Sequence, residues 1–413
     1  MDADTPDGRA AVPGFDAGRL DELGAWMADE VVSGKLPSAE ALIWRGGREV
    51  YRRRAGRLDI DRVEPLPADA IFRIYSMTKP VTNVAVMMLW QEGAFDLDDP
   101  VARFLPAFDE LRVLAGGTAD APVFESVRTR LTIRHLLTHT GGLVYGGRDD
   151  GPVGAAYRAA GVDFSLPTET LAKVVERLAS MPLLFQPGSR WTYSCAHDLL
   201  GHLVEVWSGD SLDAFFRRRI FAPLGMADTG FHLPAGAEGR FVSNYRYDAE
   251  GRLNCKNHEC TERYAHGGTL FSGGGGLVST MDDYLRFARM LLGRGSLDGV
   301  TVLKSETMEL MTRNHLPDDK GLPAMGQADH SGVAMDGIGY GLGWSVTIDA
   351  GRACAAGTMT TAGDFGWGGA ASTYFWVAPE HHMIALFMSQ LMPSAARPTR
   401  RRFRELVHRA LVG

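Results

Sequence analysis

Ser76 and Lys79 are the pair of residues in this chain with the most distinctive chemical potential. They stand in 75-YSMTKP-80, and side chains three residues apart on a helix share one face. A lysine amine that is desolvated enough to lose its proton can accept the hydroxyl proton of a serine, which turns the serine into a nucleophile. A helix-capping serine beside a solvated lysine has the same spacing, so the surrounding sequence has to decide between the two interpretations.

The predicted local structure around Ser76 would suit a nucleophile. The residues 71-IFRIY-75 predict a short buried strand, and 81-VTNVAVMMLWQEG-93 predicts a helix that ends at Gly93. Ser76 would then lie where a helix begins. Backbone N–H groups without partners and the positive end of the helix dipole stabilise negative charge that develops there.

Other catalytic patterns have less support. No serine has glycine both two positions before and two positions after it, so the α/β-hydrolase elbow is missing. His135 and His139 in 131-LTIRHLLTHTGGL-143 are four residues apart and could face one metal, but the sequence offers neither the HExxH glutamate nor a third ligand. We therefore expect structural histidines and no metal. A Ser-His-Asp triad stays open, because its members need not be close in the chain.

Several further stretches accompany the Ser-x-x-Lys pair in a fixed order. They are 75-YSMTKP-80, 131-LTIRHLLTHTGGL-143, 187-PGSRWTYSCAHDLLG-201, 223-PLGMADTGF-231, 274-GGGLVSTMDDYLRFARML-291, 340-YGLGW-344 and 367-WGG-369. Together they resemble the serine β-lactamase-like superfamily and, within it, the family VIII carboxylesterases, from about residue 20 to the C-terminus. The resemblance implies a β-lactamase-like α/β (α+β) fold and hydrolysis of carboxylic esters through an acyl-enzyme, without a cofactor.

The resemblance also assigns roles to individual residues. Ser76 would be the nucleophile, Lys79 its activating partner, and Tyr193 in 193-YSC-195 the second member of a proton relay. The backbone N–H groups of Ser76 and Ala370 would form the oxyanion hole. A neighbouring ammonium favours a phenolate, so Lys79 and Tyr193 form a coupled pair, and which of them takes the serine proton stays open.

The residues expected to bind substrate depart from the β-lactamase pattern. Trp367, Gly368 and Gly369 match the Trp-Gly-Gly of the esterases, where β-lactamases carry Lys-Thr-Gly, and Cys195 stands where class C β-lactamases have Asn. Tyr75, next to the nucleophile, would complete this set. An indole offers one neutral donor in place of a cation, so short-chain esters should be preferred and β-lactam hydrolysis should be weak.

Three alternative functions are compatible with part of these observations. A β-lactamase, D-amino-acid peptidase or acyltransferase would share the fold but use a different leaving group or acceptor. A non-catalytic penicillin-recognising binding protein would use the cleft without turnover. A metal hydrolase would use His135 and His139.

The elements that must position these residues come from both ends of the chain. A helix is predicted over 16–33, two strands joined at Gly46 and Gly47 over 39–59, and strands at 340–348, 367–379 and 383–390 before a closing helix. Helices are predicted over 96–111, 131–143, 168–181, 197–226 and, with Thr280 as its cap, up to 295. This order predicts a mostly antiparallel sheet with flanking helices, interrupted by a helical domain. The expected parts are 1–95 and 267–413 for the α/β domain and 96–266 for the helical one.

Composition limits the partners. The 413 residues are 45% hydrophobic, and a net charge of −7 argues against nucleic acid or an anionic membrane as partner. The partner that the resemblance implies is a small-molecule ester, and the oligomeric state stays open. The arginines of 397-RPTRRRFRELVHR-409 are expected on a solvated helix face. No signal peptide is visible at the acidic N-terminus, which predicts a cytoplasmic protein with reduced cysteines. Cys255 and Cys260, which flank His258, are expected in a surface loop.

Overall fold

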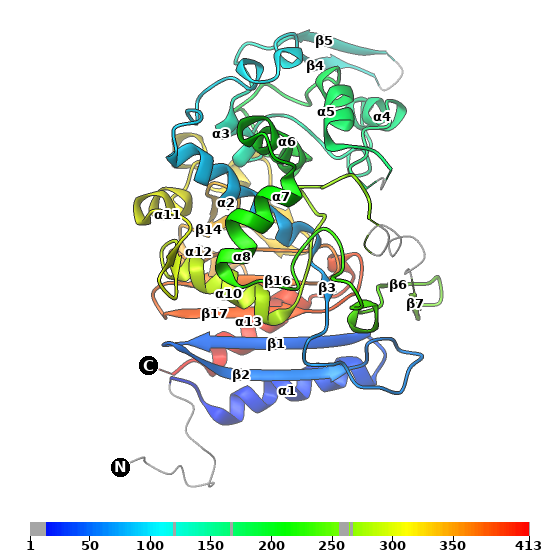
Figure 1. The fold of residues 1–413 in the computed structure, drawn as a ribbon, viewed down its shortest axis with the longest axis vertical. Helices are drawn as coiled ribbons and strands as arrows, with labels where there is room; N and C mark the ends of the chain where they lie inside the picture. The colour runs from blue at the N-terminus through cyan, green and yellow to red at the C-terminus, as the bar shows by residue number, and fades with distance from the viewer. Residues whose placement is uncertain (1–13, 119–120, 166–167, 256–263, 265–266, 413) are drawn as a thin grey trace.

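The structure is a computed structural model that describes residues 14–412, except 119–120, 166–167, 256–263 and 265–266. Its centre is a seven-stranded sheet in the order β13-β14-β15-β16-β17-β1-β2, with antiparallel pairing throughout. The strands are β1 (Ser38–Arg45), β2 (Arg48–Gly56), β13 (Ile338–Tyr340), β14 (Ser345–Thr347), β15 (Phe365–Gly368), β16 (Tyr374–Ala378) and β17 (Met383–Met388). Because β1 pairs with β17, the two ends of the chain share one sheet, as predicted (Figure 1).

Alternation along the strands gives the sheet two apolar faces. In β1, Ala41 and Ile43 pack in a core with the helices α1 (Ala17–Val32) and α13 (Thr399–Ala410), whereas Leu42 joins the opposite core. Helices α2 (Thr78–Gln91) and α10 (Met281–Leu292) contribute to that opposite core. The sheet therefore lies between two helical layers, and β1, β2 and α1 lie at the bottom of Figure 1.

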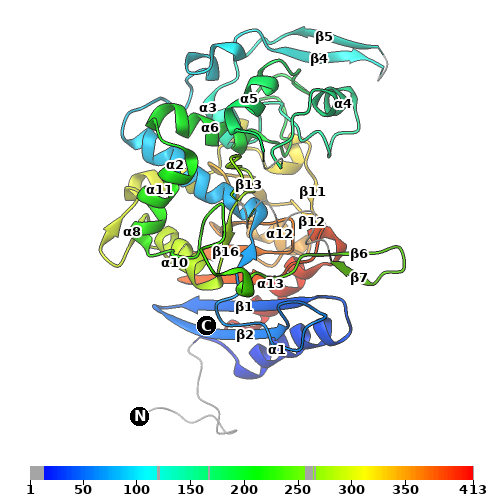
Figure 2. The same cartoon turned by 45° about the vertical axis from the view of Figure 1, so that its right-hand side comes forward.

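The segments between the two parts of the sheet contain the helices α3 (Ile133–Leu137), α4 (Pro152–Ala159), α5 (Leu171–Ala179), α6 (Ala196–Ser208), α7 (Leu212–Phe216) and α8 (Ala222–Leu224). Of these, α3, α4, α5 and α6 lie above the sheet in Figures 1 and 2. Two further helices of the described residues, α11 (Ser305–Thr312) and α12 (Ala350–Ala355), follow α10. The domain boundaries at 95 and 266 remain a prediction.

Short paired strands complete the structure. They are β3 (Phe72–Arg73) with β8 (Val278–Ser279), β4 (Arg112–Gly117) with β5 (Pro122–Ser126), β6 (Tyr245–Tyr247) with β7 (Leu253–Cys255), β9 (Ser296–Leu297) with β10 (Val300–Thr301), and β11 (Asp329–His330) with β12 (Val333–Ala334). Cys255 ends β7, but His258 and Cys260 lie outside the described residues, so the surface loop expected there stays untested.

Several predicted elements were wrong in extent. The helix expected over 96–111 is replaced by single 3-10 turns at Val101–Arg103 and Pro106–Phe108, because Pro100 and Pro106 interrupt the helical hydrogen bonds. The strand expected over 340–348 is two strands, β13 and β14, and that over 367–379 is also two, β15 and β16. In both cases a tight turn folds the apolar run back on itself.

The C-terminal arginines do not all face solvent. Arg404 of α13 is 8% exposed, and its guanidinium donates to Asp364 and Tyr374 at 2.6 and 2.7 Å. Arg397 pairs with Glu30 of α1 at 2.8 Å. The expectation of a solvated basic face was therefore wrong for Arg397 and Arg404. Arg404 anchors α13 to the sheet, and Arg397, just before α13, pairs with α1.

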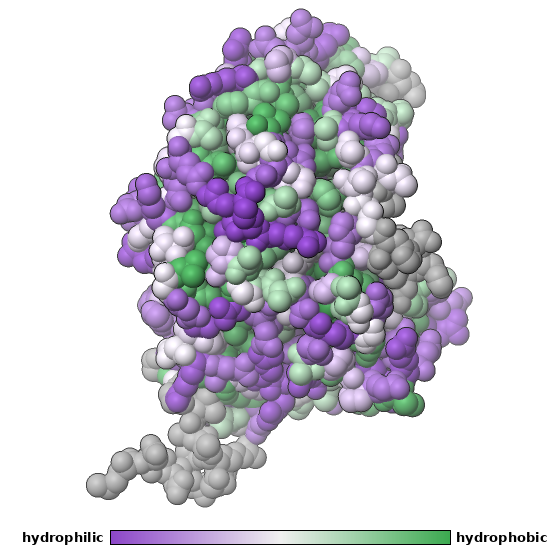
Figure 3. All heavy atoms as spheres, in the orientation of Figure 1, coloured by the Kyte–Doolittle hydropathy of each residue, from purple (hydrophilic) through white to green (hydrophobic). Residues whose placement is uncertain are grey.

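The outer surface carries no extended apolar patch on the face shown in Figure 3, where hydrophilic residues surround scattered hydrophobic ones. Within the described parts of the chain, no helix combines the length and the apolar character needed to cross a bilayer.

Candidate active site

Ser76 lies in a strained connection between β3 and α2. The backbone at Tyr75 has φ +43°, in the left-handed region that side chains seldom adopt, and a 3-10 turn over Tyr75–Met77 leads into α2 at Thr78. The strand predicted over 71–75 is therefore only two residues long, and the helix begins earlier than predicted. This sharp bend places Ser76 at the start of the helix.

The structure brings Ser76, Lys79 and Tyr193 together. The Tyr193 hydroxyl lies 2.6 Å from Ser76 Oγ, and Lys79 Nζ lies 3.4 Å from the same oxygen. Lys79 Nζ also lies 4.6 Å from the centroid of the Tyr193 ring. Lys79 is completely buried and Tyr193 is 8% exposed, so this contact is largely removed from water. The serine oxygen thus has both possible proton acceptors within reach.

The electrostatics of Tyr193 favour its ionised form. Burial alone would raise the pKa of the phenol, but the charge of the nearby Lys79 and the contact with Ser76 outweigh burial, so the pKa lies below its ordinary value of 10.0. Arg148 adds a smaller effect in the same direction. A phenolate is consequently more accessible here than in a typical tyrosine.

Two groups that sequence reasoning did not identify hold Lys79 in place. Lys79 Nζ donates to the backbone carbonyl of Gly274 at 2.7 Å and to the hydroxyl of Tyr145 at 3.1 Å. With Ser76 Oγ, these acceptors match the three N–H donors of an ammonium group. Gly274 belongs to the glycine-rich turn before β8, so the backbone of this turn is part of the site.

Asp198 of α6 holds the glycine-rich turn at Gly274 through two hydrogen bonds. Its Oδ1 accepts from Ser272 Oγ at 2.5 Å and from the Gly274 backbone N–H at 3.0 Å. A Cβ at residue 274 would lie 2.4 Å from Asp198 Oδ2, so only glycine fits. The buried carboxylate thereby fixes the carbonyl that orients Lys79.

The Trp-Gly-Gly stretch and the Ala370 that follows it border two different cavities. Trp367 is 5% exposed, and its ring stacks on His330 at 5.2 Å and lies 5.7 Å from Tyr193. Trp367 and Gly368 line a small cavity of about 60 Å³. Ala370 instead lines the same cavity as Ser76, next to Gly369, which packs closely against the Ile74 carbonyl. The oxyanion role of the Ser76 and Ala370 N–H groups stays a prediction.

The cavity at Ser76 has a volume of about 660 Å³. Tyr75, Tyr193 and Cys195 line it near the nucleophile, and it extends along the chain segments at 144–148 and 161–165. The Cys195 thiol is buried at the start of α6, and burial raises its pKa well above the ordinary value. A cavity of this size is in the range that binds small organic molecules.

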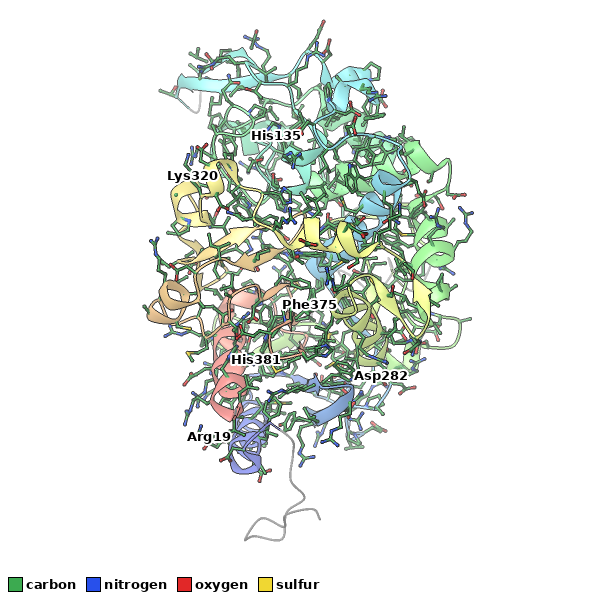
Figure 4. The ribbon with its side chains drawn as sticks, turned by 90° about the vertical axis from the view of Figure 1, so that its left-hand side faces the viewer. Arg19, His135, Asp282, Lys320, Phe375 and His381 are labelled. Carbon is green, nitrogen blue, oxygen red and sulfur yellow. The ribbon has the colours of Figure 1, made fainter. Side chains whose placement is uncertain are left out.

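The two histidines considered as metal ligands occupy separate environments. His135 caps α3 through its contact with Thr132, and α3 ends at Leu137. His139 lies past this end with φ +55°, and its Nδ1 is 3.0 Å from Ser194 Oγ. Burial lowers the pKa of both imidazoles. Figure 4 places His135 well above Phe375 of the sheet. Within the described residues, no group of three or more His, Cys, Asp and Glu side chains is arranged for a metal.

Comparison with known proteins identifies the relatives of this site. The family described as Beta-lactamase matches residues 20–409, which include Ser76, Lys79, Tyr193 and Trp367. The chain belongs to the beta-lactamase family. It is 36% identical to Protein Rv1367c of Mycobacterium tuberculosis over 378 residues, which cover 91% of this chain and 90% of that protein.

Two further relatives are named as enzymes. Esterase EstB of Burkholderia gladioli is 33% identical over 356 residues, or 81% of each protein. The structure of EstCE1, described as a hydrolase with promiscuous acyltransferase activity, matches with a TM-score of 0.76 and 26% identity over 95% of this chain and 99% of that one. The chain is thus a serine hydrolase of the β-lactamase-like fold, as the sequence predicted.

The beta-lactamase-family site of this chain includes residues that lie far apart in the sequence. Tyr145, Arg148 and Asp198 line the cavity at Ser76, whereas His330 and Arg400 lie behind Trp367. Tyr145 and Arg148 come from a loop with no recognisable pattern. No signal in a single sequence connects such residues to Ser76, and only the fold brings them there.

Proposed function

We propose that this chain is a carboxylesterase that hydrolyses short-chain esters through an acyl-enzyme on Ser76. The observation that carries the proposal is the position of Ser76 Oγ, 2.6 Å from the Tyr193 hydroxyl and 3.4 Å from Lys79 Nζ, at the edge of a 660 Å³ cavity. The kinship with Esterase EstB supports the choice of substrate class.

In the proposed reaction, Ser76 Oγ attacks the ester carbonyl carbon while its proton passes to the Tyr193–Lys79 pair. The alcohol leaves with that proton, and a water molecule then attacks the acyl group and gives its own proton to the pair. Ser76 recovers a proton as the acid departs. Backbone N–H groups of Ser76 and Ala370 would stabilise the oxyanion in both steps.

The residues at positions 367 and 195 favour esters over β-lactams as substrates. At position 367 an indole replaces the lysine of the β-lactamase pattern, and the structure buries that indole against Tyr193 and His330. The absence of an ammonium group at this position removes a charge-assisted contact worth about 1.5–3 kcal/mol from carboxylate recognition there. Cys195 lacks the amide of the Asn found in class C enzymes, and its thiol is a weak hydrogen-bond donor.

The test is a comparison of kcat/KM for p-nitrophenyl butyrate, nitrocefin and a D-alanyl peptide with the same enzyme preparation. The butyrate should exceed both other substrates by at least about tenfold, given the contact energies above. A kcat/KM for nitrocefin that equals or exceeds the butyrate value would replace the carboxylesterase by a β-lactamase.

Transfer of the acyl group to an alcohol is a second candidate, favoured by the size of the cavity. A volume of 660 Å³ leaves space for an acceptor beside a short acyl group, and EstCE1 is a hydrolase with promiscuous acyltransferase activity. Adding butanol or a larger alcohol during turnover of vinyl butyrate separates the two reactions. Ester formation at a constant total rate of acyl release supports transfer, and butyrate as the sole product supports hydrolysis.

A further inference from the structure

Three cations surround the ring of Tyr193 and its neighbour His330. Lys79 Nζ and Arg148 Cζ lie 4.6 and 5.2 Å from the Tyr193 ring centroid. Arg400 lies behind Trp367, where it donates to the Gly369 carbonyl at 2.5 Å. Burial, followed by the charges of Arg400, Arg148 and Lys79, lowers the pKa of His330 to about 3. Within the described part of the chain, none of these three cations forms an ion pair with a carboxylate.

The carboxylates of the cavity are engaged elsewhere. Asp198 accepts from Ser272 and Gly274, as described above. Asp163 accepts from the backbone and side chain of Ser165 at 2.8 and 2.7 Å. The region around Tyr193 therefore carries a surplus of positive charge, which is an unusual environment for a site that would bind only neutral esters.

Arg148 is the member of this group that a substrate can reach. Arg148 is exposed and lines the same 660 Å³ cavity as Ser76. Its guanidinium lies over the Tyr193 ring and has no hydrogen-bond partner among the described residues, whereas Arg158 in the same cavity donates to the carbonyls of Gly146 and Asp149. A guanidinium presents a planar fork of donors that matches the two oxygens of a carboxylate.

We propose that Arg148 binds a carboxylate carried by the substrate, so that the preferred substrates are esters with a free carboxyl group on the 145–165 side of the cavity. This inference rests on the proposed esterase function and narrows its substrate class. The Tyr193 hydroxyl is in contact with Ser76, and Arg148 lies over the ring of the same tyrosine. One small molecule can therefore reach both Ser76 and Arg148.

The experiment uses two pairs of esters that differ in charge and little in shape. In the first pair, 3-butyryloxybenzoate and 3-butyryloxybenzamide, the charge is on the leaving group. In the second, the mono-p-nitrophenyl ester of pimelic acid and p-nitrophenyl heptanoate, the charge is on the acyl group. The wild-type enzyme should favour the charged member of at least one pair by about tenfold or more in kcat/KM, and the pair that responds shows which side of the ester faces Arg148.

The variants Arg148→Gln and Arg148→Lys connect this preference to the residue. Arg148→Gln should bring the charged-to-neutral ratio close to one, and Arg148→Lys should keep part of it, because lysine retains the charge and loses the fork. Loss of Arg148 also removes a charge near Tyr193, but this affects both members of a pair equally and cancels in the ratio. Arg190→Gln is the matched control, since Arg190 is also exposed and lies 5.5 Å from an aromatic ring, Phe185, but does not line the cavity.

A ratio at or below one in both pairs with the wild-type enzyme would overturn the proposal, as would a preference that survives Arg148→Gln. Turnover of the neutral esters reports separately on the proposed function. If the neutral esters are hydrolysed and the ratio is near one, the esterase assignment stands and the carboxylate subsite is wrong. If no ester is hydrolysed by the wild-type enzyme, both proposals fail together.

Discussion

At the scale of single residues, the environment of Lys79 suggests how the relay divides its work. The ammonium group has three acceptors, Ser76 Oγ, the Tyr145 hydroxyl and the Gly274 carbonyl. Tyr193 is closer to Ser76 Oγ than Lys79 is, and its pKa is lowered by its neighbours despite burial. We therefore favour Tyr193 as the group that takes the serine proton, with Lys79 as the charge that makes its phenolate accessible.

Residues that act as one unit should show non-additive effects. Lys79→Ala and Tyr193→Phe should each lower kcat by several orders of magnitude, and the double variant should be little worse than either single one. Stopped-flow or steady-state turnover of p-nitrophenyl butyrate measures all three. If the two losses multiply in the double variant, the residues act independently and the relay is wrong.

Tyr145 should affect turnover through the hydrogen bond that its hydroxyl accepts from Lys79. Tyr145→Phe removes one of the three acceptors of the ammonium and should lower kcat about tenfold or more, with a smaller change in KM, because about 1–3 kcal/mol is lost when a buried donor is left unsatisfied. Tyr157→Phe is the control, since Tyr157 lines the same cavity and forms no hydrogen bond to Lys79 in the described structure. Equal effects of the two substitutions would show that Tyr145 only fills space.

At the scale of elements, the nucleophile depends on three segments that meet. The bend between β3 and α2 presents Ser76, the turn before β8 presents the Gly274 carbonyl, and the turn between β15 and β16 presents Ala370. The β15–β16 turn contacts the β3–α2 bend at Gly369, where a Cβ would lie 2.2 Å from the Ile74 carbonyl oxygen. This contact packs the turn that carries Ala370 against the bend that carries Ser76.

Gly369→Ala should therefore move the β15–β16 turn away from the nucleophile. We expect a loss of about 1–3 kcal/mol in the free energy of unfolding from overpacking. We also expect kcat/KM to be about tenfold to hundredfold lower, because the oxyanion donor proposed at Ala370 would be displaced. Gly239→Ala is the control, because a Cβ there meets no atom within 4 Å. Wild-type turnover by Gly369→Ala would show that this turn takes no part in the site.

The elements predicted correctly from the sequence are those in which one short motif, such as a glycine turn or a helix cap, determines the local structure. The hairpin of β1 and β2 follows from Gly46 and Gly47, which adopt φ +57° and +91°, and the cap of α10 follows from Thr280, whose side chain accepts from the Asp283 N–H. The prediction was wrong where turns interrupt apolar runs, as between β15 and β16, since apolar periodicity alone does not locate a reversal. Ser76, Lys79 and Tyr193 were predicted from their motifs, and the structure brings the three side chains together. Tyr145 and Arg148 were missed, because their roles depend on tertiary proximity.

At the scale of the whole molecule, a charge cluster joins the sheet to its helical layer. Glu40 of β1 is completely buried and lies 3.4 Å from Arg52 of β2, which also pairs with Asp282 of α10. Figure 4 shows Asp282 beside the strands at the N-terminal end of the chain. Burial raises the pKa of Glu40 to about 7 from 4.5, although Arg52 and Arg54 oppose the shift.

This buried carboxyl group should make stability depend on pH. Between pH 4.5 and 7 the folded state keeps a proton that the unfolded state loses, so the free energy of unfolding should fall as pH rises, by up to about 3 kcal/mol. In Glu40→Gln the fall between pH 5 and 8 should be smaller by about 1–3 kcal/mol, measured by urea unfolding with tryptophan fluorescence. Glu49→Gln removes another carboxylate that pairs with Arg52 and should keep the wild-type slope. Identical slopes in all three proteins would contradict this account of Glu40.

The central claim is that Ser76 carries the acyl group, and intact-protein mass spectrometry tests it directly. Wild-type protein mixed briefly with p-nitrophenyl butyrate and quenched in acid should gain the mass of one butyryl group, and peptide mapping should place that group on Ser76. Ser76→Ala should fold, because a small residue at the start of a helix costs only about 1 kcal/mol, and it should gain no mass and lose turnover. Ester turnover by Ser76→Ala within tenfold of wild type, or a butyryl group on another residue, would contradict the account.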